Sequence, residues 1–281
     1  DGKEINSDGA RFRGEGEDLA AEDFVILFAG DSFTYGWNLP YEAAYPYQFE
    51  ALAQSAGCEP EVRVVNLGWT SSSPLLGLRL LRQVAYKYRP DLVVYSLDVT
   101  DFHDDLRYER SLREQKDFEF DSSAMAERLL LTYWPSARSA VPFVRAITDR
   151  LRTVNRAERE QWLEGLTVPG RLERFFVTAR PLEESRPAIE FGVMRNLAEM
   201  QAFSAGVLGS AMAVVIYPRA YQYSEREASQ SWELGYEALG PHVQEPFRYF
   251  TEVEGSLPYP VLSILPDFEA SEEFPLFYSR D

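Results

Sequence analysis

The feature that most constrains the fold is a short apolar run, residues 24–28, that leads into Gly30-Asp31-Ser32. The run is rich in residues that favour extended backbone and predicts a strand buried inside a parallel sheet. In such sheets, ligands bind at the edge formed by the carboxyl ends of the strands. Ser32 is therefore expected at that edge. It is either the N-cap of a following helix or a reactive hydroxyl that faces free backbone N–H groups.

Strand-like and helix-like segments alternate along the first hundred residues and again near the end of the chain. The expected strands cover 24–29, 62–66, 91–97, 212–217 and 260–264, and the expected helices cover about 46–56, 75–88 and 188–206. This alternation predicts right-handed βαβ crossovers. We therefore expect a three-layer α/β/α sandwich around a mostly parallel, flavodoxin-like, five-stranded sheet.

Residues 102–186 lack this alternation of strand-like and helix-like segments. The segment is rich in Arg and Glu with aromatic residues between them, and 124–133 and 141–163 have helical patterns. We expect one domain over 1–281, with 102–186 as a helical insertion within it. The insertion is either an elaborated surface or a cap that shapes a substrate cleft.

Charge and cysteine content limit the partners of the chain. It has 28 basic and 45 acidic residues, a formal net charge of −17, which disfavours nucleic acid and anionic membranes as partners. Cys58 is the single cysteine, so an internal disulfide is excluded. The cysteine content therefore does not indicate in which cellular compartment the protein lies. No apolar run reaches the roughly 18 residues that a membrane-spanning helix needs.

Several stretches, in order, resemble the sequence blocks of the SGNH (GDSL) hydrolase family. They are Gly30–Gly36, Val62–Gly68, Pro90–Tyr95 with Val99–Asp101, and Phe277–Asp281. The resemblance implies the SGNH hydrolase fold and a serine esterase that acts through an acyl-enzyme. Its substrates would be small acyl esters or O-acetylated carbohydrates. We expect no cofactor and no metal.

The resemblance also implies roles for individual residues. Ser32 would be the nucleophile, and Asp281 would orient a catalytic histidine two or three residues further on. The backbone N–H groups of Ser32 and Gly68 would form the oxyanion hole. Thr100 lies where the family usually has asparagine, and its hydroxyl would be a third donor to the oxyanion. Neither His103 nor His242 has the family's spacing from an aspartate. We therefore expect the native chain to continue past Asp281.

Other residues near the predicted sheet edge have two interpretations each. Trp37 and Trp69 each follow a motif and form either a substrate-binding wall, for instance for sugar stacking, or part of the core. Arg219 follows the fourth strand and either holds an anionic substrate group or is a surface arginine. His103 is either an alternative base or a partner of neighbouring carboxylates.

Four aspartates follow the third expected strand: Asp98, Asp101, Asp104 and Asp105. They could hold a hard cation, but they lack the regular spacing of a calcium loop. We favour a structural role for Asp98 and Asp101, in which they bind backbone N–H groups at the strand end. Asp31 and Asn66 are expected to anchor turns in the same way.

Two other functions fit the same residues. One is an O-acyltransferase that uses the same site, and the other is a catalytically silent SGNH-fold subunit that binds a carbohydrate or a protein assembly. The lead-in over residues 6–14 is similar to segments that follow a signal or membrane anchor in the family. We therefore expect an extracytoplasmic protein whose only membrane contact is an anchor outside this sequence.

Overall fold

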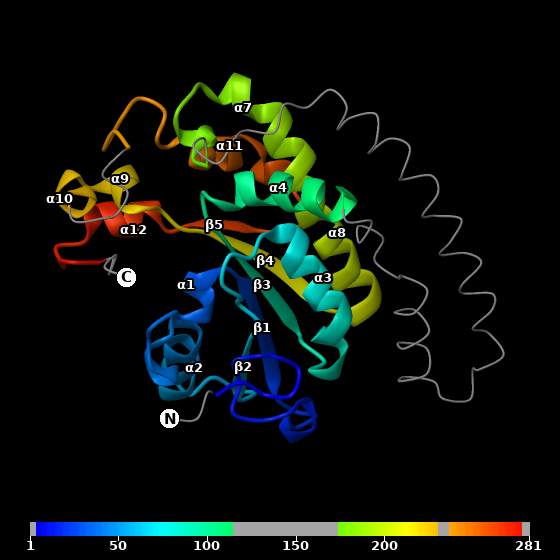
Figure 1. Ribbon diagram of the computed structural model, residues 1–281. Helices are drawn as coiled ribbons and strands as arrows, with labels where there is room; N and C mark the ends of the chain where they lie inside the picture. Colours follow the sequence, from blue (N-terminus) through cyan, green and yellow to red (C-terminus); the bar gives the residue numbers. More distant parts are fainter. Residues whose placement is uncertain (1–3, 115–173, 230–235, 277–281) are drawn as a thin grey trace.

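The computed structural model describes residues 4–114, 174–229 and 236–276 (Figure 1). At its centre lies a five-stranded sheet in the order β2-β1-β3-β4-β5, with every neighbouring pair parallel. The strands are β1 (Phe24–Gly30), β2 (Val62–Asn66), β3 (Leu92–Leu97), β4 (Ala211–Ile216) and β5 (Val261–Ser263). This strand order is that of flavodoxin-like folds, so the predicted fold class is confirmed.

The strands are continuous apolar runs because helices cover both faces of the sheet. Six of the seven residues of β1 are buried. Phe28 of β1 is in register with Val94 of β3, which is in register with Ala213 of β4, so one row of apolar side chains crosses the sheet. The expected strands agree with the structure to within one or two residues at each end.

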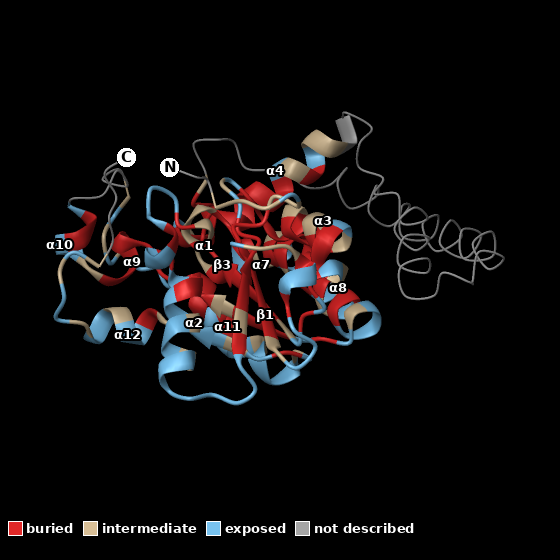
Figure 2. Ribbon diagram, turned by 90° about the horizontal axis from the view of Figure 1, so that it is seen from below, coloured by how far each residue is buried: buried red, intermediate tan, exposed pale blue. Residues whose placement is uncertain are grey.

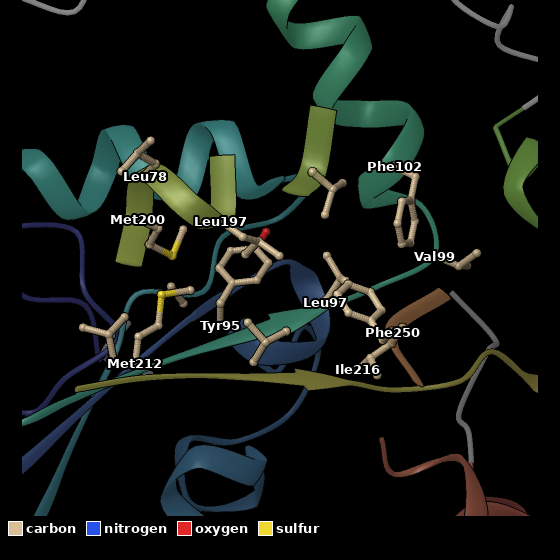
Figure 3. Packing of buried hydrophobic residues seen from close by; sticks show 14 of the residues in the cluster. Leu78, Tyr95, Leu97, Val99, Phe102, Leu197, Met200, Met212, Ile216 and Phe250 are labelled. Atoms are coloured by element: carbon tan, nitrogen blue, oxygen red, sulfur yellow. The ribbon is translucent and has the colours of Figure 1, made fainter. Parts of the chain in front are cut away.

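The main core lies between one face of the sheet and a layer of helices (Figures 1 and 3). These helices are α3 (Pro74–Val84), α4 (Asp101–Glu114), α7 (Leu182–Ile189), α8 (Arg195–Phe203) and α11 (Glu245–Val253). Tyr95 of β3 meets Leu78 of α3 and Met200 of α8 there. A smaller cluster on the opposite face lies under α2 (Tyr45–Ser55) and contains Phe28. Burial is therefore concentrated around the sheet (Figure 2).

Shorter elements complete the described chain. They are α1 (Ser32–Tyr35), α9 (Ala220–Tyr223), α10 (Glu225–Ala228) and α12 (Leu265–Ala270), with π-helical turns at Glu190–Met194 and Ser204–Leu208 and 3₁₀ turns at Gly16–Asp18, Tyr41–Ala43, Ala85–Lys87, Phe176–Thr178 and Glu254–Ser256. The π-helical turns extend α7 and α8 into one nearly continuous helical stretch. None of the described helices is both long enough and apolar enough to cross a membrane.

The described ends of the predicted insertion belong to the α/β core. Phe102 and Leu106 of α4 are buried in the main cluster, and so are residues 175–177. The expected helices at 124–133 and 141–163 lie outside the described residues. The interpretation of this segment as a cap stays a prediction.

Gly68 marks a close contact between the turn after β2 and helix α1. A Cβ atom built on Gly68 would lie 2.4 Å from the backbone nitrogen of Tyr35 and 2.7 Å from the carbonyl carbon of Thr34. Backbone atoms cannot move aside as the end of a flexible side chain can. A side chain at position 68 would therefore push α1 away from its place.

We predict that Gly68→Ala destabilises the protein by about 1–3 kcal/mol, the usual cost of overpacking. The matched control is Gly206→Ala, because a Cβ at this exposed glycine meets nothing within 4 Å. That change should leave stability unchanged or raise it slightly. Urea unfolding of both variants checks the pair, and equal midpoints would contradict the predicted contact.

Candidate active site

Ser32 lies at the carboxyl end of β1 as the first residue of α1. The side chain of Asp31 caps this short helix by accepting a hydrogen bond of 2.9 Å from the backbone N–H of Phe33. Ser32 itself is half-buried. Its hydroxyl has no hydrogen-bond partner among the described residues. The anchoring role predicted for Asp31 is confirmed, and the Ser32 hydroxyl is available for chemistry.

A buried ion pair joins the ends of β3 and β4 beside this turn. The Arg219 guanidinium donates from Nε to Oδ1 of Asp98 at 2.8 Å and from Nη2 to Oδ2 of the same carboxylate. Both residues are buried. Burial alone would raise the pKa of Asp98, but the charge and hydrogen bonds of Arg219 hold it below its usual value. The pair is a planar fork-to-fork contact of the kind that arginine makes best.

This pair corrects the prediction that Arg219 holds an anionic substrate group. Its charge is already paired with Asp98, and its side chain is only 6% exposed. It is also not a surface arginine, which was the other interpretation. From a loop just after β4, the side chain points back across the sheet edge, a direction that the sequence does not reveal.

Thr100 also differs from its predicted role. Its hydroxyl donates to Oδ2 of Asp98, and the residue is buried. A hydroxyl whose proton is held by a buried carboxylate is not free to donate to an oxyanion. The structural role expected of Asp98 and Asp101 is confirmed: Asp98 accepts from the N–H of Val99 at 2.7 Å, and Asp101 accepts from the N–H of Asp98 at 3.0 Å.

Asp31 is tied to the far side of the site through Tyr217. The Tyr217 hydroxyl donates to Oδ1 of Asp31 at 2.7 Å and so connects the end of β4 to the cap of α1. Burial and the nearby charge of Asp98 raise the pKa of Asp31 to about 6, against the opposing effect of Arg219. The nucleophile candidate therefore sits on a turn whose cap residue is bound from the end of β4.

The N–H of Gly68, a predicted oxyanion donor, already has an acceptor. It donates to Oδ1 of Asn66 at 2.8 Å, while Nδ2 of Asn66 donates to the carbonyl of Thr34 at 2.7 Å. Asn66 therefore has the structural role expected of it. A substrate oxygen at Gly68 would have to share this N–H or displace the asparagine, so the oxyanion role stays a prediction.

Trp37 and Trp69 are not part of the core. They are 56% and 49% exposed. The ring of Tyr35 lies between them, with its centroid 6.2 Å from the centroid of each indole. The backbone N–H of Trp37 donates to the carbonyl of Ser32, and that of Trp69 donates to the carbonyl of Gly30, both at 3.0 Å. Both tryptophans therefore lie next to the Ser32 turn.

His103 is buried on α4, and its Nδ1 lies 3.1 Å from Oδ1 of Asp104. Asp104 also accepts from Nη2 of Arg174 at 2.8 Å. His103 is thus a partner of a neighbouring carboxylate. Within the described ranges, no three His, Cys, Asp or Glu side chains are arranged to hold a metal ion. Asp281 lies outside the described residues.

Arg11 and Tyr35 are parts of the site that the sequence does not single out. Buried Arg11 donates from Nη1 to the carbonyls of Tyr35 and Gly36, at 2.6 and 2.9 Å, and from Nη2 to that of Leu39 at 2.6 Å. Its own backbone forms an antiparallel bridge with Asn66. The available signal is weak: Arg11 lies in the lead-in before β1, and Tyr35 lies inside the first motif.

No protein-family model matches the sequence, and no curated protein matches it. Among solved structures the chain is similar to AlinE4, an SGNH-hydrolase family esterase, with 14% identity over 94% of this chain and 86% of that chain and a TM-score of 0.43. It is similar to TesA with 14% identity over 84% and 76% of the two chains and a TM-score of 0.39. A mutant of Axe2, an acetylxylan esterase from Geobacillus stearothermophilus, matches 41% of this chain and 56% of that chain, with 22% identity and a TM-score of 0.22.

We predict that Arg219→Ala destabilises the protein by about 3–5 kcal/mol, because it leaves the buried Asp98 carboxylate without its cation. Arg82→Ala is the control: its ion pair with Glu199 is partly exposed, with N and O 3.2 Å apart, and should contribute less than about 1 kcal/mol. Urea unfolding measures both. Equal losses in the two variants would contradict the structural role of the buried pair.

A second prediction concerns Asp105, which is buried and accepts from the N–H of Leu75 and from Nδ2 of Asn196, both at 2.7 Å. Burial raises its pKa from 3.8 to about 6. The folded state therefore holds this proton more tightly than the unfolded state. The resulting stability is present below about pH 4 and is lost as pH rises through 6.

Asp105→Asn removes this titration. The free energy of unfolding of the variant minus that of the wild type should rise by about 2 kcal/mol between pH 4 and pH 7. Urea unfolding of both proteins at four pH values checks this. A flat difference would show that the pKa of Asp105 is ordinary in the fold.

Proposed function

We propose that the protein is a serine ester hydrolase of the SGNH type in which Ser32 is the nucleophile. One observation carries the proposal: Ser32 is half-buried and its hydroxyl is unpaired among the described residues, on a turn whose cap residue, Asp31, is paired. The turn lies at the carboxyl edge of a parallel sheet, where α/β proteins bind their ligands. The order of the sequence motifs supports the same assignment.

In the proposed reaction, Ser32 Oγ bonds to the acyl carbon of an ester and its proton passes through a base to the departing alcohol. Water then attacks the acyl-enzyme, releases a carboxylic acid and restores the serine. The resemblance implies that this base is a histidine oriented by Asp281. The N–H groups of Ser32 and Gly68 would bind the oxyanion, the latter by sharing its bond with Asn66.

The proposed substrates are small acyl esters or O-acetylated carbohydrates. If the acceptor were a sugar hydroxyl in place of water, the same acyl-enzyme would give an O-acyltransferase. A catalytically silent binding subunit is the second candidate. It is favoured by the hydrogen bonds that already occupy the Gly68 N–H and the Thr100 hydroxyl.

The test is labelling of the native, full-length protein with a fluorophosphonate, followed by peptide mapping. We expect label on Ser32, since the reagent reacts with activated serines, and complete loss of label in Ser32→Ala. Ser55→Ala, on the exposed face of α2, is the control and should label like the wild type. Folded full-length protein without label would overturn the esterase proposal and favour the silent subunit.

A further inference from the structure

Three aromatic side chains lie together beside Ser32, and we call them the aromatic strip: the exposed Trp37 and Trp69 and the partly buried Tyr35. The two indoles are about half-exposed, and the Tyr35 ring lies between them at 6.2 Å from each, tilted by 40° and 72°. Leaving large apolar rings in water is unfavourable for a folded chain. A group of them in one place is typical of a binding surface.

The strip is tied directly to the candidate nucleophile. Its two tryptophans are held through backbone hydrogen bonds to Ser32 and to Gly30, two residues before it. Tyr35 is the last residue of the helix that begins with Ser32. The backbone that carries the strip is thus fixed relative to the Ser32 turn by main-chain hydrogen bonds.

Arg11 contacts Tyr35 of the strip and the loop that carries Trp37. Its guanidinium carbon lies 5.3 Å from the centroid of the Tyr35 ring, and it donates to the three carbonyls of Tyr35, Gly36 and Leu39. Leu39 in turn donates its N–H to the carbonyl of Gly36. The loop that presents Trp37 is therefore ordered before a ligand arrives, which lowers the entropic cost of binding.

We propose that the aromatic strip is a stacking subsite for a neutral sugar ring in the alcohol part of the ester. A sugar presents an apolar C–H face that packs flat on aromatic rings, and hydroxyl groups at its rim. Thr70 and Ser71 follow Trp69 in the sequence, and their hydroxyl groups are suitable hydrogen-bond partners for such hydroxyls.

The net charge of the chain and the exposure of the rings favour a neutral sugar over an anionic glycan or a long acyl chain. The net charge of −17 disfavours an anionic glycan. A long acyl chain binds best in an enclosed apolar cavity, whereas these rings are open to solvent. The proposal rests on the proposed function only in saying that the sugar carries the ester, because binding itself does not require the serine.

The test uses the full-length protein with Ser32→Ala, so that no ester is consumed. Xylohexaose and cellohexaose, each with and without O-acetyl groups, are titrated in by calorimetry and by tryptophan fluorescence. We expect binding of at least one probe. Trp37→Ala and Trp69→Ala should each weaken it about tenfold or more, and Trp37→Phe should retain most of the affinity. Leu52→Ala is the control, since Leu52 is 67% exposed on α2 and lies outside the strip.

Three results would overturn the proposal. The first is that the folded protein binds none of the four neutral probes. The second is that it binds them with unchanged affinity in both tryptophan variants. The third is tryptophan-dependent binding of decanoate in place of sugars, which would assign the strip to the acyl group. Sugar binding without fluorophosphonate label on Ser32 would support the stacking subsite and contradict the esterase proposal. The binding test and the labelling test can therefore fail independently.

Discussion

The ion pair between Asp98 and Arg219 is the interaction on which the carboxyl edge of the sheet depends. Two charges removed from water are stable only with close geometry and further hydrogen bonds, and here Thr100 and Val99 supply some of them. The guanidinium carbon of Arg219 also lies 4.6 Å from the centroid of the Phe33 ring. The pair thus fixes the ends of β3 and β4 against the helix that carries Ser32.

Most polar side chains around Ser32 act on the backbone and not on a substrate. Asp31 caps the helix, Asn66 binds a carbonyl and an N–H of two adjacent turns, and Thr100 supports Asp98. Each group is buried and satisfied, which is the condition under which polar networks make a region rigid. The hydroxyl of Ser32 differs from these three groups, because it has no hydrogen-bond partner among the described residues. This contrast is why Ser32 is the centre of the proposed chemistry.

The sequence predicts those parts of the site whose causes are local. Strand rhythm predicts the sheet, and the bond from Phe33 to Asp31 spans two residues, so a turn motif reveals it. The pairing of Arg219 with Asp98 spans 121 residues, and the bonds from Arg11 to the Tyr35–Leu39 loop span 24 to 28. No local sequence pattern predicts such contacts, because they depend on how distant segments pack together in the fold. For the same reason, the sequence does not predict whether Trp37 and Trp69 are exposed.

The antiparallel bridge from Arg11 to Asn66 has a consequence for where the functional unit begins. The lead-in before β1 contributes no strand to the five-stranded sheet, although Phe12 and Leu19 are buried in the main cluster. Its arginine donates to three carbonyls of the loop that follows the candidate nucleophile. A fragment starting at β1 would contain every strand and every proposed catalytic group in the described chain. It would nevertheless lack the side chain that orders the Tyr35–Leu39 loop. The shaped surface beside Ser32 therefore depends on a residue that precedes the first strand of the sheet.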